Sequence, residues 1–308
     1  MLKTYQTTVS EPIRFEGIGL HFGTNTKITI LPAKSNEGIA FKRIDLKNNN
    51  YIKASYLNVT STKLCTTLEN EYGTKVSTVE HLLAAMYLAE IDNAIVEINS
   101  EEVPIMDGSA KDFLAEFKKS KNIELSEKRK YLEILSRVEL SDGKRKISAE
   151  PSNDTFEVQF ELKYKNKIIG NQKNKINFNK DDINDVSKSR TFCLYEDIEK
   201  IKKAGLAKGG SLNNAIVVDE SKVLNKDGLR NEKEFVNHKI LDLAGDFLLS
   251  GYRVIGKIDC VQGGHALSNQ FLRKIFKTKN AFILKNKNEF KFSKEASLKP
   301  FEKIAINA

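Results

Sequence analysis

One apolar-periodic segment, residues 232–249, constrains the fold of this chain more strongly than any other. Its spacing of apolar residues predicts a long helix that ends before Gly251. His238 and Asp242 lie four residues apart in it, so a helix places their side chains on one face, about one turn apart. Taken alone, this pair also fits a solvated ion pair on a helix. Equally, an imidazole and a carboxylate at this spacing can bind one side of a divalent metal, most commonly zinc.

A second histidine favours the metal interpretation. His81 directly follows Glu80 in the apolar segment STVEHLLAAMYL. With His238 and Asp242 it would supply two imidazoles and one carboxylate, and leave a fourth position open for water, which is typical of hydrolytic metal sites. The chain has 4 histidines, and three of them lie in short segments rich in glycine or small apolar residues. Histidines with only a surface role would be scattered among the many lysines and asparagines.

Glu80 has two interpretations. Ser77 and Glu80 have the spacing of a capping box, so Glu80 alone would be interpreted as part of a helix cap. Adjacent helical residues point about 100° apart. If His81 binds a metal from one side, Glu80 can therefore reach the activated water from beside it, where a general base belongs.

Three further side chains carry chemistry in this pattern. His265 follows Gly263 and Gly264 at the end of a predicted strand, where glycines allow close approach of a ligand, and we interpret it as a general acid or electrostatic group. Asp246 lies one turn beyond Asp242, and could hold His265 protonated by raising its pKa. The hydroxyl of Thr191 offers a donor for a developing oxyanion.

The 308 residues suffice for two domains. A polar, charge-dense stretch from Lys118 to Tyr131 is the predicted link, which gives domains at 1–125 and 126–308. Each half contains strands, one principal helix and further strand, so we expect a duplicated α+β unit. The predicted strands are 27–33, 93–99, 131–140, 156–164, 215–219 and 253–261, and the predicted helices are 78–89, 110–118, 195–204, 232–249 and 266–276. After Phe290 we expect a short strand followed by loosely held residues.

Composition limits the cellular setting. The 3 cysteines form no CxxC pair, so neither a disulfide framework nor a thiolate zinc site is indicated, and they fit a reducing cytoplasm. The first residues contain no apolar signal core, and no apolar run approaches the roughly 20 residues of a membrane span. The net charge of +9 calls for an anionic partner: nucleic acid, an anionic membrane surface or a polyanionic substrate.

Seven sequence blocks, in order, make a resemblance specific. They are GIGLHFG, STVEHLLAA, PIMDGSA, SRTF, GLAKGGSLNNAIVVD, LNKDGLRNEKEFVNHKILDLAGD and GGHALSN. The chain resembles the UDP-3-O-acyl-N-acetylglucosamine deacetylases, the zinc amidases of lipid A biosynthesis, from about residue 3 to residue 290. One departure is Asn237, where an arginine before the zinc histidine is common.

The resemblance implies a role for each matching residue. One zinc ion per chain would be bound by His81, His238 and Asp242. Glu80 would be the general base, and His265, oriented by Asp246, the cationic acid or transition-state stabiliser. Whether Glu80 acts alone or with His265 in moving the proton stays open. Thr191 would assist in stabilising the oxyanion. The substrate-binding site would be lined by Leu64, Phe192, Asp197 and Lys239.

The same resemblance implies an architecture and a substrate. We expect two similar sheet-and-helix domains in a layered sandwich, with helices packed between the domains and a small insert in each; the second insert would be a βαβ unit near 194–218. The substrate would be UDP-3-O-[(R)-3-hydroxyacyl]-N-acetylglucosamine, hydrolysed to acetate and a free amine in the committed step of lipid A biosynthesis. We expect a cytoplasmic monomer that touches the inner membrane surface peripherally and binds no nucleic acid.

Two alternatives remain from the residues themselves. A metal amidase of the same architecture could act on another N-acyl sugar, and comparison of short with long acyl chains would separate the two. A non-catalytic nucleic-acid binder has only the basic charge in its favour, and would show steeply salt-dependent affinity without bound zinc.

Overall fold

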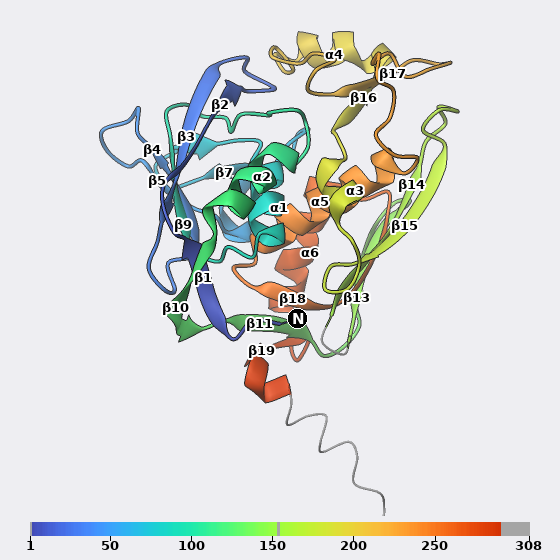
Figure 1. Ribbon diagram of the computed structural model, residues 1–308. Helices are drawn as coiled ribbons and strands as arrows, with labels where there is room; N and C mark the ends of the chain where they lie inside the picture. Colours follow the sequence, from blue (N-terminus) through green and yellow to red (C-terminus); the bar gives the residue numbers. More distant parts are fainter. Residues whose placement is uncertain (1, 153–154, 291–308) are drawn as a thin grey trace, which may run out of the picture.

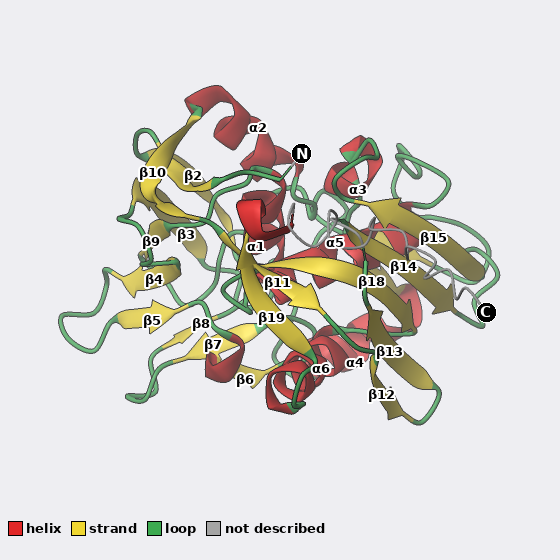
Figure 2. Cartoon of the chain, turned by 90° about the horizontal axis from the view of Figure 1, so that it is seen from below, coloured by secondary structure: helices red, strands yellow, loops and turns green. Residues whose placement is uncertain are grey.

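The computed structural model describes residues 2–152 and 155–290. Two sheet layers enclose a layer of helices (Figure 1). Figure 2, from below, shows the strands of the first sheet on one side of the helices and those of the second on the other. This is the α+β sandwich expected from the sequence. The C-terminal strand and tail predicted after Phe290 lie outside the described residues.

The first sheet contains five strands from the N-terminal part of the chain. Their order is β2 (Ile13–Ile18), β3 (Asn25–Pro32), β9 (Ala94–Ile98), β4 (Ile39–Arg43) and β5 (Tyr51–Lys53). β4 and β9 are parallel, and the other pairs are antiparallel. Side chains along β3 alternate between buried and more exposed, as expected when one face covers the core. A small separate sheet is formed by β6 (Val59–Ser61), β7 (Thr67–Glu69) and β8 (Lys75–Val76).

The second sheet is centred on β18 (Arg253–Val261), which is parallel to β11 (Lys130–Ile134) and β14 (Phe156–Lys163). The remaining strands are β12 (Val138–Asp142), β13 (Arg145–Glu150), β15 (Asn171–Asn177) and β19 (Phe282–Asn286). The strand predicted over 131–140 is therefore two strands, β11 and β12, which are not neighbours in the sheet.

A small βαβ unit lies above this sheet in Figure 1. β16 (Phe192–Leu194) and β17 (Ile216–Val218) pair in parallel. A 3₁₀ turn, η2 (Tyr195–Asp197), and helix α4 (Ile198–Lys203) lie between them in the chain, so the helix predicted over 195–204 is present in shortened form.

The charged segment predicted to be a link is ordered. Helix α2 (Lys111–Ser120) continues into it, and β10 (Asn122–Lys128) pairs with β1 (Tyr5–Val9) in an antiparallel ribbon. Its charge density reflects an exposed ribbon whose side chains are solvated, which sequence alone does not distinguish from a loop. The domain boundary at residue 125 stays a prediction.

Two buried helices form the centre of the sandwich. In α5 (Glu234–Leu248) every residue except Lys239 is buried, and in α1 (Glu80–Leu88) every residue except Leu88 is buried. A helix that is buried on all sides must lie inside the protein rather than on it. α3 (Asn184–Lys188), α6 (His265–Lys277) and the 3₁₀ turn η1 (Tyr56–Asn58) are further helical elements, and residues 287–290 are also helical.

α1 and α5 approach so closely that their backbones touch. A Cβ atom added at Gly245 would lie 2.1 Å from the carbonyl oxygen of Glu80 and 3.1 Å from the nitrogen of Ala84. Only glycine permits this contact, and it fixes the first turn of α1 against the middle of α5.

Gly245→Ala tests this contact. In an open helix the change would stabilise by about 1 kcal/mol. Here we expect the reverse, a loss of about 1–3 kcal/mol in the free energy of unfolding, because a methyl group must displace backbone. Urea denaturation measures it, and a variant as stable as the wild type would show that the helices can separate at no cost.

Candidate metal centre

The contact between α1 and α5 brings together the three residues predicted to bind a metal. His81 comes from the first turn of α1, and His238 and Asp242 from successive turns of α5. Oδ1 of Asp242 lies 3.5 Å from Nε2 of His81 and 3.3 Å from Nε2 of His238. One ligand atom from each residue lies within 4.8 Å of the other two. The distances therefore allow all three to share one ion.

The chemistry of this group fits a divalent cation. Oδ1 of Asp242 is buried and has no hydrogen-bond partner among the described residues, which is costly unless a cation lies beside it. Burial lowers the pKa of His238 to about 3, so this imidazole is neutral and can act as a ligand. Its Nδ1 lies 3.1 Å from the carbonyl oxygen of Ser189, which suits a proton on Nδ1 and a free lone pair on Nε2. Burial opposes ionisation of Asp242, but the ammonium group of Lys239 beside its carboxylate holds the pKa of Asp242 well below the usual range.

Glu80 lies beside this group and does not cap its helix. The N-cap of α1 is Val79, with no side-chain cap bond, so the interpretation of Glu80 as a capping residue is wrong. Instead Glu80 is 3% exposed, and its Oε2 accepts a hydrogen bond of 3.0 Å from the backbone N–H of Thr66. Burial raises its pKa, and this exceeds the opposite effect of His265 and His81. The Glu80 carboxylate is thus fixed in position by a hydrogen bond, and its affinity for a proton is increased.

His265, at the start of α6, faces two carboxylates. Its Nδ1 donates to Oδ2 of Asp246 at 3.0 Å, and its Nε2 lies 3.7 Å from Oε1 of Glu80. Burial alone would lower the pKa of His265, but Asp246 and Glu80 outweigh it and raise the pKa to about 10. The imidazole is therefore cationic at neutral pH in this setting.

Thr66 is a residue that sequence reasoning missed. It is 1% exposed, and its hydroxyl donates to Oδ1 of Asp246 at 2.8 Å while its backbone N–H holds Glu80. One residue of the first half thereby orients both carboxylates that contact His265. Its local sequence, Cys-Thr-Thr-Leu, predicts only a strand, so no local signal could have identified it.

Two predicted substrate residues lie next to the metal-ligand group. Nζ of Lys239 lies 2.9 Å from Oδ2 of Asp242 and 5.5 Å from the centroid of the Phe192 ring. The Phe192 ring centroid is in turn 6.2 Å from that of His238. Lys239 also lines a cavity of about 390 Å³ with Lys144, Arg145 and Lys163. A cavity lined by four cations and one acid, Asp142, therefore lies next to Lys239, which connects it to the metal-ligand group through Asp242.

The other three predicted residues are placed differently. Thr191 immediately precedes Phe192, and its backbone N–H donates to the carbonyl of Gly108 at 2.8 Å. Leu64 is 50% exposed, with φ of 66°, in the turn that leads to Thr66. Asp197 lies in η2 and pairs with Lys200 at 3.3 Å. No described contact joins Asp197 to the metal-ligand group.

Asp242→Ala tests the metal-ligand group directly. We expect wild-type protein to bind one divalent ion, and the variant to bind it at least about 100-fold more weakly, because loss of a direct ligand exceeds the 10- to 100-fold effect typical of supporting residues. Metal analysis and competition with a chelating dye measure both. Asp219→Ala, in an exposed turn, is the control, and equal affinities in all three proteins would contradict the assignment.

Thr66→Val removes a donor from a buried carboxylate while preserving shape. We expect a loss of about 1–3 kcal/mol in the free energy of unfolding. Thr67→Val is the matched control, since its hydroxyl pairs with two neutral groups, the hydroxyl of Ser77 at 3.0 Å and the thiol of Cys65 at 3.9 Å. If Thr66→Val lowered the free energy of unfolding no more than Thr67→Val does, the hydrogen bond to Asp246 would contribute no more to stability than an ordinary buried hydroxyl contact.

Comparison with known proteins gives a consistent result. A family model described as LpxC, UDP-3-O-acyl N-acetylglycosamine deacetylase, matches residues 6–277. A UDP-3-O-acyl-N-acetylglucosamine deacetylase of Pseudomonas entomophila is 42% identical over 298 residues, 96% of each chain. Proteins of the same name from Pseudoalteromonas translucida and Haemophilus ducreyi are 40% and 38% identical over 280 residues, which cover 90% of this chain and 92% of theirs.

Proposed function

The chain belongs to the UDP-3-O-acyl N-acetylglycosamine deacetylase family, and from that premise we propose how its side chains perform the reaction. The protein is a hydrolase of lipid A biosynthesis that removes the acetyl group from UDP-3-O-acyl-N-acetylglucosamine. One observation carries the proposal. Oδ1 of Asp242, which has no hydrogen-bond partner among the described residues, faces two histidine nitrogens, and the carboxylate of Glu80 is fixed beside them by a hydrogen bond.

The metal in this proposal is zinc, held by His81, His238 and Asp242. Two imidazoles and one carboxylate, with a position left open, are a ligand set typical of catalytic zinc. When bound, the ion supplies Lewis-acid polarisation of the amide carbonyl and lowers the pKa of a water molecule. Lys239 neutralises the second oxygen of Asp242, which leaves Oδ1 for the metal.

Glu80 is the proposed general base. Its Oε2 is held by the N–H of Thr66, so Oε1 is the oxygen available to take a proton from the attacking water. The raised pKa of Glu80 brings its proton affinity nearer to neutral pH, where a general base works best. Water that loses its proton here attacks the acetamide carbon.

His265 is the proposed cationic partner. Because its Nδ1 is bound to Asp246, only Nε2 can serve the substrate, either stabilising negative charge or giving a proton to the leaving amine. Oε1 of Glu80 and Nε2 of His265 lie 3.7 Å apart. Glu80 can therefore accept a proton from the water while His265 gives one to the leaving amine. The pair supports a mechanism in which both residues move protons, rather than Glu80 alone.

The remaining contacts are proposed from the family resemblance and, for Phe192 and Lys239, from their position beside the metal-ligand group. The hydroxyl of Thr191 is proposed to donate to the oxyanion, and Leu64 to contact the acetamide. The ring of Phe192, next to Lys239, is proposed to line the sugar site. The cavity with Lys144, Arg145 and Lys163 suits the diphosphate, because cations there offset the phosphate charge. Asp197 matches a family position near the nucleotide, and we propose that it lies near the nucleotide here.

The cellular setting is proposed from the charge of the chain and the nature of its substrate. Among the described residues no helix combines the length and apolar character needed to cross a membrane. The net charge of +9 would favour an anionic membrane surface, where an acylated substrate is available. A cytoplasmic location and a monomeric state stay predictions.

Glu80→Ala and His265→Ala separate catalysis from metal binding. We expect both variants to retain zinc, because neither residue is a proposed ligand. Turnover should fall by at least about 100-fold, in line with loss of a general base or acid. Steady-state rates of acetate release, together with zinc content, measure this, and a near-normal rate in either variant would remove that residue from its role.

The pH dependence of kcat/KM tests the two raised pKa values. Glu80 must be ionised, so activity falls as pH drops through its raised pKa; His265 must be protonated, so activity falls as pH rises through its own. For Asp246→Asn we expect the alkaline limb to move at least about one pH unit lower, since the carboxylate that raises the pKa of His265 is lost.

Asp45→Asn, remote from the site and paired with Arg43, is the control for that profile. An alkaline limb that stays in place in Asp246→Asn would show that Asp246 does not set the charge of His265.

A further inference from the structure

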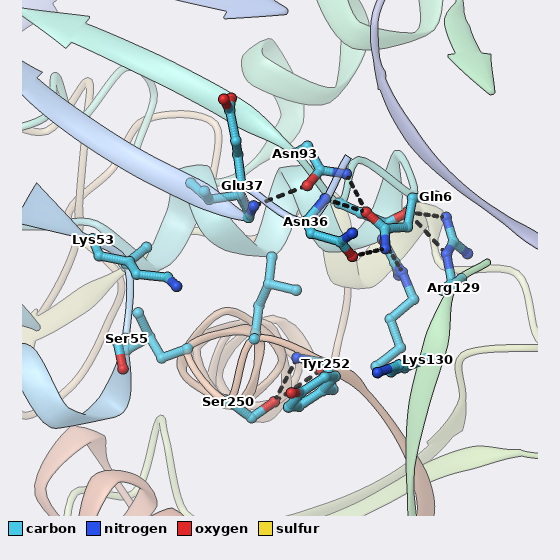
Figure 3. Close-up of a pocket in the computed structure, with 18 residues that line it drawn as sticks. Gln6, Asn36, Glu37, Lys53, Ser55, Asn93, Arg129, Lys130, Ser250 and Tyr252 are labelled. Carbon is cyan, nitrogen blue, oxygen red and sulfur yellow. Dashed lines mark hydrogen bonds and ion pairs between the residues drawn. The ribbon is translucent and has the colours of Figure 1, made fainter. Parts of the chain in front are cut away.

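A second cavity, of about 300 Å³, lies between the two halves of the molecule and shares no lining residue with the metal-ligand group (Figure 3). Its walls come from both sheets: Lys53 belongs to β5 of the first, and Lys130 to β11 of the second. Ile39 and Leu248 also line it, and so does Ser250, just beyond the C-terminal end of α5. Asp242 and Ser250 are eight residues apart, or about 12 Å along a helix.

The acceptors along one wall of this cavity, those of Asp92 and Gln6, are already occupied. The carboxylate of Asp92 accepts from Arg129 at 2.7 Å and from Arg253 at 3.2 Å. Oε1 of Gln6 accepts from the backbone N–H of Asn36 and from Nδ2 of Asn93. Figure 3 shows this network along one wall. A ligand that offers only donors would therefore find few partners here.

Several donors, in contrast, are free. Lys53 and Lys130 are exposed at the mouth of the cavity, and within residues 2–152 and 155–290 neither Nζ has a hydrogen bond or ion pair. The hydroxyl of Tyr252, which also lines the cavity, likewise has no hydrogen bond within the described residues. In Figure 3 the amino groups of Lys53 and Lys130 lie on opposite sides of the cavity. Such a cavity suits a ligand rich in acceptors.

The charge balance gives the same result. Four cations, Lys53, Arg129, Lys130 and Arg253, and two acids, Glu37 and Asp92, line the cavity, and Glu90, outside it, lies 3.9 Å from Arg129. The Glu37 carboxylate points away from the other labelled side chains in Figure 3. The C-terminal end of α5 contributes only about half a negative charge, and the last carbonyl, that of Leu249, already accepts from Tyr56. A net positive charge therefore remains uncompensated.

We propose that this cavity is a binding site for a small multivalent oxyanion, held between Lys53 and Lys130, which links the two sheets at the end of α5 remote from the metal-ligand group. The ligand class is set by the surplus of donors and positive charge, and its source is either a phosphate or a polycarboxylate. The proposal is independent of the deacetylase mechanism, because no residue of the metal-ligand group takes part.

The test uses the metal-loaded full chain with inorganic pyrophosphate and, separately, citrate, at constant ionic strength. Titration calorimetry measures affinity, and thermal unfolding measures stabilisation. We expect one of the two anions to raise the melting temperature by a few degrees. Lys53→Ala and Lys130→Ala should each weaken its binding at least about tenfold, the effect of losing one charge-assisted hydrogen bond.

Two controls separate this site from its surroundings. Lys47→Ala removes an exposed lysine of the same half that has no described partner, and should change nothing. Lys144→Ala weakens only anion binding in the cationic cavity beside Lys239. Any removal of metal by the anions affects all variants alike, since none alters a metal ligand. Binding of both anions that is unchanged in Lys53→Ala and Lys130→Ala, or absent in wild-type protein, would overturn the proposal.

Discussion

The arrangement of this protein depends on the contact between the backbones of α1 and α5 at Gly245. That contact places Glu80 and His81 directly against His238, Asp242 and Asp246, although the two segments are more than 150 residues apart in the sequence. A larger residue at Gly245 would move the first turn of α1 away from α5. The ligand distances, the position of Glu80 and its contact with His265 all follow from this one approach.

The same contact brings several charged side chains together in the interior of the protein. Three buried carboxyl groups, of Glu80, Asp242 and Asp246, face two cations, Lys239 and His265. Buried charge that is not balanced costs several kcal/mol per ion. A divalent metal beside Asp242 supplies the positive charge that the side chains lack, so the same ion that serves the chemistry also supports the folded arrangement.

Sequence reasoning identified what is local and missed what is distant. His238 and Asp242 could be predicted because a helix brings residues four apart to one face, and the buried strands could be predicted from alternation. The role of Thr66 could not, because its partners Glu80 and Asp246 lie 14 and 180 positions away. The ribbon of β1 and β10 was missed for a related reason, since its pairing joins opposite ends of the first half. The approach of α1 to α5 was predicted only indirectly, from residue types that could share one metal and from the resemblance of whole sequence blocks, because no local pattern pairs the two helices.

The direct test of this account is anomalous diffraction at the zinc edge from crystals of the metal-loaded protein. We expect one strong peak between α1 and α5, about 2.0–2.2 Å from Nε2 of His81, Nε2 of His238 and Oδ1 of Asp242, with Glu80 and His265 outside its ligand sphere. A single ion bound instead by Glu80 and His265, or no ion between the two helices, would contradict it.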